Sequence, residues 1–165
     1  GICFGLMGVL IILNATGVFS EVVINEIMPN PAKVNDDLGE YFELYNSGSE
    51  NIDVNGWTIK DEGSNSHTIN NTGELKLFSD EYLVLCINKN ITINGGVECD
   101  YQYSTFALTN SNDAIIILDH NGVEQDKVKY ATAAASHFAD GISMELNDSS
   151  SDNNIMTNWK KATAS

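Results

Sequence analysis

Short segments of alternating apolar and polar residues recur along the chain from Glu21 onward. In residues 40–46 (EYFELYN), for example, Phe42 and Leu44 face one way and the residues between them face the other. Such alternation over four to eight residues is typical of a half-buried β-strand. The same pattern predicts strands over residues 21–27, 40–46, 57–60, 66–70, 74–78, 82–88, 113–119, 123–130 and 142–146, with a last one at Trp159.

Turn residues separate these segments. The pair Asn121-Gly122 lies between two apolar runs and predicts a tight hairpin, because a type I′ turn needs positive φ at both central positions. No segment keeps a 3.6-residue apolar period for three turns, and residues 131–135 predict one helical turn at most. The chain is therefore expected to be all-β, with about eight or nine short strands around one core.

The first residues have a different character. Residues 1–20 carry no charge and contain one apolar run, residues 6–13, which is too short for an ordinary transmembrane helix. The pattern predicts a secretory signal peptide cut between Ser20 and Glu21, with a mature domain over residues 21–165. Because the chain begins with glycine and lacks a basic start, we expect the signal to be truncated. The alternative is a retained hydrophobic segment, as in pilin-like or lipid-anchored proteins.

If the protein is exported, its cysteines can be expected to form a disulfide. Removing the signal removes Cys3 and leaves Cys86 and Cys99, an even pair in an oxidising compartment. A bridge between them would close a loop of about 14 residues, worth roughly 3 kcal/mol in the chain-entropy model. The alternative is a free, buried Cys86 in a strand and an exposed Cys99.

Composition and charge narrow the class of protein. The 165 residues contain 8 basic side chains, all of them lysine, against 23 acidic ones, which gives a net charge of −15. This balance argues against binding to nucleic acid or to anionic membrane surfaces. With 42% hydrophobic and 19% charged residues, the chain has enough apolar surface to fold.

One acidic loop is a candidate cation site. Asp36, Asp37 and Glu40 surround Gly39, and Ca²⁺ prefers carboxylate and carbonyl oxygens. The loop lacks EF-hand spacing, however. A solvated acidic loop without any cofactor is therefore the main expectation, and Ca²⁺ is the alternative.

The order of the motifs resembles the lamin tail domain family in its prokaryotic, secreted form. The matching segments are, in chain order, VVINEIM (22–28), EYFELYN (40–46), VNGWTIKD (54–61), YLVL (82–85), FALTN (106–110), the hairpin at 118–122, SMEL (143–146) and Trp159. The resemblance implies an immunoglobulin-like β-sandwich and a glycine- and proline-containing tail beyond residue 165.

Within such a sandwich the matching apolar residues would form the core. They are Phe42, Leu44, Trp57, Leu83, Leu85, Ile115 and Ile117. Burial of each would contribute about 1.5–3 kcal/mol. For Trp57 the alternative is an exposed platform on which a sugar stacks.

The sequence gives little support for catalytic residues. Glu26 and Glu43 recur in the family pattern and suggest a carboxylate pair, but strand residues that bind backbone amides or face solvent are the better interpretation. His67, His120 and His137 share no metal-binding or catalytic motif. We expect His120 in a tight turn and the other two at the surface.

The resemblance therefore implies a secreted, non-catalytic interaction module for adhesion, scaffolding or extracellular attachment. Its partner would be a protein or a cell surface, without nucleic acid and without stable membrane insertion after signal cleavage. Two alternatives stay open. The chain could be an accessory domain of a longer exported hydrolase or nuclease, or a surface filament subunit that assembles through its hydrophobic N-terminus.

Overall fold

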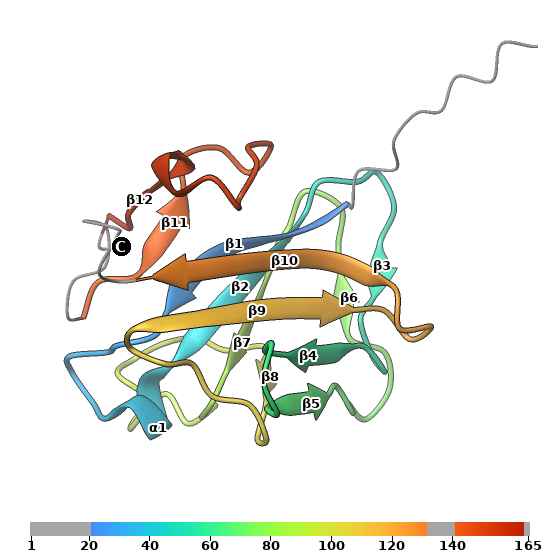
Figure 1. Cartoon of the computed structure of the whole chain (residues 1–165). Coiled ribbons are helices and arrows are strands. Elements are labelled where there is room, and N and C mark those ends of the chain that lie inside the picture. Colours follow the sequence, from blue (N-terminus) through green and yellow to red (C-terminus); the bar gives the residue numbers. More distant parts are fainter. Residues whose placement is uncertain (1–20, 132–140, 164–165) are drawn as a thin grey trace, which may run out of the picture.

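The computed structural model describes residues 21–131 and 141–163. The predictions for the signal segment at residues 1–20, for a helical turn after Ala131 and for His137 lie outside this part of the chain. Two β-sheets pack face to face, with their strands crossing at an angle (Figure 1). The sandwich predicted from the sequence is confirmed.

The larger sheet has six strands in the order β12-β11-β1-β2-β7-β8. All neighbours are antiparallel except β7 and β8, which are parallel. Their bounds are β1 (Val22–Met28), β2 (Tyr41–Asn46), β7 (Tyr82–Cys86), β8 (Tyr101–Gln102), β11 (Met144–Leu146) and β12 (Trp159–Lys161). Strands from both ends of the described chain therefore meet in one sheet.

The smaller sheet has four strands in the order β10-β9-β4-β5, and a separate pair joins β3 to β6. The bounds are β3 (Ile52–Asp53), β4 (Thr58–Lys60), β5 (Ser66–Thr68), β6 (Lys76–Leu77), β9 (Asn112–Leu118) and β10 (Glu124–Ala131). Two short helical elements complete the described fold, the helix α1 (Asp36–Gly39) and a 3-10 turn, η1 (Met156–Asn158).

The core lies between the two sheets. Every residue predicted for it is buried, with Trp57 and Leu83 at 5% and 4% exposure and the other five at 0%. Trp57 is thus packed inside rather than presented as a sugar platform. The aromatic rings of Phe42, Tyr103 and Phe106 contact one another within this core.

The predicted number of strands is too low, since twelve strands occur in the described ranges. The strands missed are β3 and β8, because a pairing of two residues has no alternation to detect. The short helix α1 was also not predicted, and its four residues are fewer than a helical period needs.

A β-bulge in β1 determines which side chains face outward. Pairing with β2 runs Ile24 opposite Leu44 and then Glu26 opposite Glu43, so Asn25 is the extra residue. Without the bulge, strict alternation would turn Glu26 toward the core and Ile27 away from it. With it, Ile27 is fully buried, while Asn25 and Glu26 are both only half-buried.

No helix in the described ranges has the length and hydropathy that a membrane span requires.

Candidate binding groove

A groove of about 820 Å³ lies over the outer face of the six-stranded sheet, the face opposite the buried core side chains. We call it the outer groove. Its floor consists of outward-facing residues of β1, β2, β7 and β11, and its walls are the segments 31–34, 94–98 and 141–143. Its volume is within the range of ordinary ligand sites.

Three glutamates lie side by side across the floor. Glu26 on β1 pairs with Glu145 on β11 and, on its other side, with Glu43 on β2. Like charges directly opposite one another destabilise a sheet. Repulsion among these three carboxylates therefore lowers the stability of the folded state, and hydrogen bonds from neighbouring side chains offset only part of this loss.

Neutral donors hold two of these carboxylates. The hydroxyls of Tyr41 and Ser143 both donate to Glu26 Oε1, at 2.6 and 2.5 Å. The amide of Asn25, placed outward by the bulge, donates to Glu43 Oε1 at 2.9 Å. These bonds orient the carboxylates but leave their negative charge uncompensated.

The third glutamate has a cationic partner. Lys160 on β12 lies 3.0 Å from Glu145 Oε1. Both side chains are partly exposed, so the pair contributes little to stability.

The floor is electrostatically unfavourable for negative charge. Burial, with a smaller effect from the negative charges of Glu26 and Glu145, raises the pKa of Glu43 to about 7, against the lowering effect of the Asn25 hydrogen bond. Burial, together with Glu26, also raises the pKa of the Tyr41 hydroxyl. Tyr41 is therefore a neutral hydrogen-bond donor at physiological pH.

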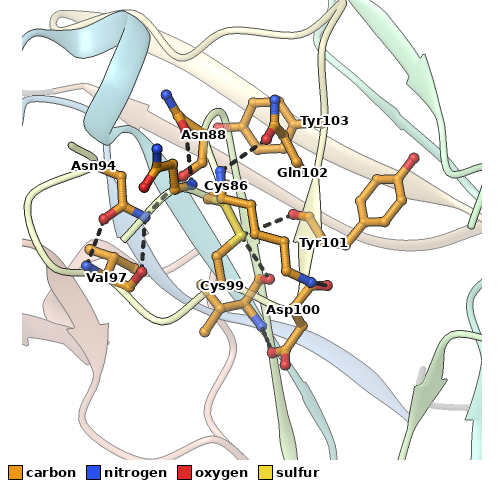
Figure 2. The surroundings of a disulfide bond; sticks show 12 residues. Cys86, Asn88, Asn94, Val97, Cys99, Asp100, Tyr101, Gln102 and Tyr103 are labelled. Atoms are coloured by element: carbon orange, nitrogen blue, oxygen red, sulfur yellow. Dashed lines mark hydrogen bonds between the residues drawn. A yellow bond between two sulfur atoms is a disulfide. The ribbon is translucent and has the colours of Figure 1, made fainter. Parts of the chain in front are cut away.

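One wall of the groove is fixed by the side chain of Asn94, which is 2% exposed. Its amide nitrogen donates to the carbonyls of Asn88 and Val97, at 2.9 and 2.8 Å, and its oxygen accepts from the N–H groups of Gly96 and Val97, at 3.0 Å each. Figure 2 shows Asn94 beside the disulfide, with its hydrogen bonds to Val97 as dashed lines. A single buried amide thus replaces the regular hydrogen bonding that the loop lacks.

The base of the same loop is closed by a disulfide between Cys86 and Cys99, whose Cα atoms are 6.1 Å apart (Figure 2). The predicted bridge is confirmed. Because it joins the end of β7 to the residue that follows the 94–98 wall, it restrains the position of that wall.

The other wall depends on close backbone contact. Gly141 has φ +76°, and its N–H donates to the carbonyl of Asn30 at 2.8 Å. A Cβ at this position would lie 2.6 Å from the Cβ of Ala32. Only glycine therefore allows the 141–143 segment to reach the 31–34 segment.

The three carboxylates considered as an alternative cation site point in different directions. Glu40 is 3% exposed, and its Oε2 accepts from the N–H of Leu108 at 2.9 Å. Asp36 Oδ2 instead accepts from the Asn110 amide at 2.8 Å, and Asp37 is exposed. Across residues 21–131 and 141–163, no three acidic, histidine or cysteine side chains are grouped closely enough to hold a metal ion.

The histidines are placed partly as expected. His120 is exposed in the hairpin turn. His67 is half-buried rather than on the surface, because its Nε2 lies 2.8 Å from the Tyr101 hydroxyl and its Nδ1 accepts from the Ser104 N–H. Burial lowers the pKa of His67.

Several residues of the groove were not identified from the sequence. Asn94 and Gly141 had a detectable signal, since each belongs to a polar or glycine-containing turn. Ser143, Glu145 and their pairing with Glu26 had none, because that contact joins strands at opposite ends of the described chain.

The two crossed sheets and the buried tryptophan define an immunoglobulin-like β-sandwich that presents a groove on one outer face. The chain belongs to the Lamin Tail Domain family, whose model matches residues 16–132. The family consists of non-catalytic immunoglobulin-like domains. No curated protein matches the chain. The family match ends before β11 and β12, so Ser143 and Glu145 lie beyond it.

Proposed function

We propose that this chain is an exported interaction module that binds a macromolecular partner through the outer groove. The observation that carries the proposal is the groove itself, a walled recess on a sheet face that a stable sandwich does not need. Asn94, the disulfide and Gly141 all fix its walls. Rigid walls reduce the entropy lost on binding.

The same features support a role without catalysis. Glu26 and Glu43, the pair that suggested acid–base chemistry, are engaged by Tyr41, Ser143 and Asn25 at the floor of a sheet. The groove offers a binding surface rather than a nucleophile with an adjacent base. The inward direction of Glu40 supports a module that works without a cofactor.

Two features support export. The uncharged first 20 residues have the pattern of a signal peptide, and the Cys86–Cys99 disulfide belongs to an oxidising compartment. We therefore place the mature domain outside the cell or at its surface, where it serves adhesion, scaffolding or attachment. A net charge of −15 favours protein or cell-surface partners over nucleic acid.

Export is tested by expressing the full chain in a secreting host and analysing the medium by mass spectrometry. We expect a chain that starts at Glu21 and a non-reduced peptide that links Cys86 to Cys99. An intact Gly1 in the secreted protein would contradict signal cleavage.

The groove is tested by photo-crosslinking on living cells. A crosslinking amino acid replaces Val97, in the groove wall, or Val123, which is 56% exposed and absent from the groove lining. Partner adducts should form from position 97 and not from position 123. Equal adducts from both positions would show that the groove is not the binding surface.

A further inference from the structure

We propose that the outer groove binds an extended segment of a partner protein that carries lysine or arginine side chains. This inference rests on the proposed binding role of the groove and specifies the chemistry of its occupant. The argument comes from the arrangement of charge and apolar surface over the sheet face.

The floor of the groove holds more negative charge than the molecule itself compensates. Lys160 pairs with Glu145, but Glu26 and Glu43 have no cation within ion-pair distance in the described part of the chain. Their hydrogen-bond donors are neutral. An incoming ammonium or guanidinium group would separate the like charges and make charge-assisted hydrogen bonds.

The outer rim of the groove adds further negative charge. Glu98 is exposed in the 94–98 wall and is also in the groove lining. Lys33, in the 31–34 segment that adjoins Gly95, is the one basic side chain among the lining residues that the structure describes. Acidic groups therefore extend from the floor to one edge, which favours a chain with several positive charges over a single small cation.

Apolar side chains flank the row of glutamates. Met28 and Val84 belong to the floor, Val97 to one wall and Ile142, which is 38% exposed, to another. Lysine and arginine pack their aliphatic stems on apolar surface while the charged end reaches a polar group. Apolar surface beside an acidic row thus fits a basic peptide better than it fits a neutral one.

Other occupants fit less well. A second copy of this chain carries the same charge of −15 and would be repelled, as would any polyanion. A metal ion would need three or more ligating side chains in one group, and residues 21–131 and 141–163 contain no such group.

The test measures, at pH 8, binding of a fluorescent peptide of alternating lysine and serine to the disulfide-bonded mature domain, because Glu43, with a pKa of about 7, is mostly ionised at this pH. We expect saturable binding that weakens with added salt. Glu43→Gln should weaken it about tenfold. Glu124→Gln, which removes the same charge from β10, should change it by less than about twofold. Equal weakening by both variants would overturn the inference, because it would show attraction to net charge alone.

A second pair of variants tests the inference even if Glu43→Gln does not fold. Glu98→Lys reverses an exposed charge at the rim, and Glu124→Lys reverses one on the other sheet. Only the first should abolish peptide binding. Equal binding of a serine–glycine peptide by the unmodified domain would also overturn the inference.

The two proposals can fail separately. Adducts at position 97 without lysine-peptide binding would leave the groove as a binding surface and reject a basic occupant. Lysine-peptide binding that Glu43→Gln weakens, without adducts in cells, would confirm the charge preference and reject the cellular role.

Discussion

The carboxylate of Asp126 on β10 accepts a hydrogen bond from the backbone N–H of Ile24 on β1, at 2.6 Å. The bond joins an edge strand of the smaller sheet to a central strand of the larger one. Asn153 Nδ2 donates to the same carboxylate oxygen at 2.6 Å and to the Ile24 carbonyl at 3.3 Å. The Asp126 side chain therefore connects both sheets to the C-terminal segment that contains Asn153.

Asp126→Ala should lower the free energy of unfolding by about 1–3 kcal/mol, because it leaves the Ile24 N–H without this acceptor and removes one of the two acceptors of Asn153 Nδ2. Asp126→Asn keeps an oxygen at this position and should cost less. Chemical denaturation measures both, with exposed Asp37→Ala as the control. An Asp126→Ala variant as stable as the control would show that water replaces the lost acceptor.

Removal of the disulfide should destabilise the fold and loosen the groove wall. Cys86→Ala together with Cys99→Ala should lower the free energy of unfolding by roughly 3 kcal/mol in the chain-entropy model. Hydrogen exchange should increase between residues 87 and 98, which the bridge encloses, and stay unchanged in β9 and β10. Uniform exchange across the domain would indicate that the bridge stabilises the whole fold without fixing this wall.

The buried carboxyl of Glu40 makes stability depend on pH. Burial raises its pKa in the folded protein from 4.5 to about 7, although the Leu108 hydrogen bond lowers it. Between these two values the folded state binds more protons than the unfolded state, so the free energy of unfolding falls as pH rises through this window.

Glu40→Gln keeps an acceptor for Leu108 and removes the charge. It should stabilise the protein at pH 8, by at most about 3 kcal/mol, and have little effect below pH 4.5. Thermal melting at the two pH values measures this. A gain of the same size at both pH values would assign the effect to packing rather than to ionisation.

Gly141→Ala should destabilise the domain, because the new Cβ would combine a strained backbone with a collision against Ala32. Gly122→Ala is the matched control, since Gly122 also has positive φ (+78°) but no atom near the position of a Cβ. The difference in unfolding free energy between the two variants isolates the contact. Equal losses would mean that the 31–34 wall moves aside easily.

Loss of the close contact between Gly141 and Ala32 should also weaken partner binding in the groove. Gly141→Ala should weaken photo-crosslinking at position 97 more than Gly122→Ala does, because only Gly141 lies in the groove lining. Circular dichroism of both variants confirms that the fold is retained.

The strands that form this fold were predictable where alternation is regular. Residues 40–46 and 82–88 contain β2 and β7 nearly to the residue, since each places apolar side chains on one face. The predicted segment 21–27 covers most of β1, but its buried isoleucines, Ile24 and Ile27, are three apart. That spacing conflicts with a period of two, and it is the trace of the bulge in the sequence.

The groove was less predictable because it depends on long-range pairing. Glu26 and Glu43 were interpreted as strand residues that bind backbone amides or face solvent, whereas they are half-buried and accept hydrogen bonds from side chains. Their alignment with Glu145 depends on β11 lying beside β1, which no local pattern indicates. The walls depend on buried Asn94, a residue type that ordinary hydropathy assigns to the surface.

The extra residue in β1 also sets how this region tolerates change in chain length. Exchanging Asn25 for another residue would remove one hydrogen bond, whereas deleting it would restore strict alternation after Ile24. Glu26 would then still face outward and Ile27 would still point into the core, because the strand would lose only its unpaired residue. In a family alignment, this segment should therefore accept both substitutions and a single gap at position 25.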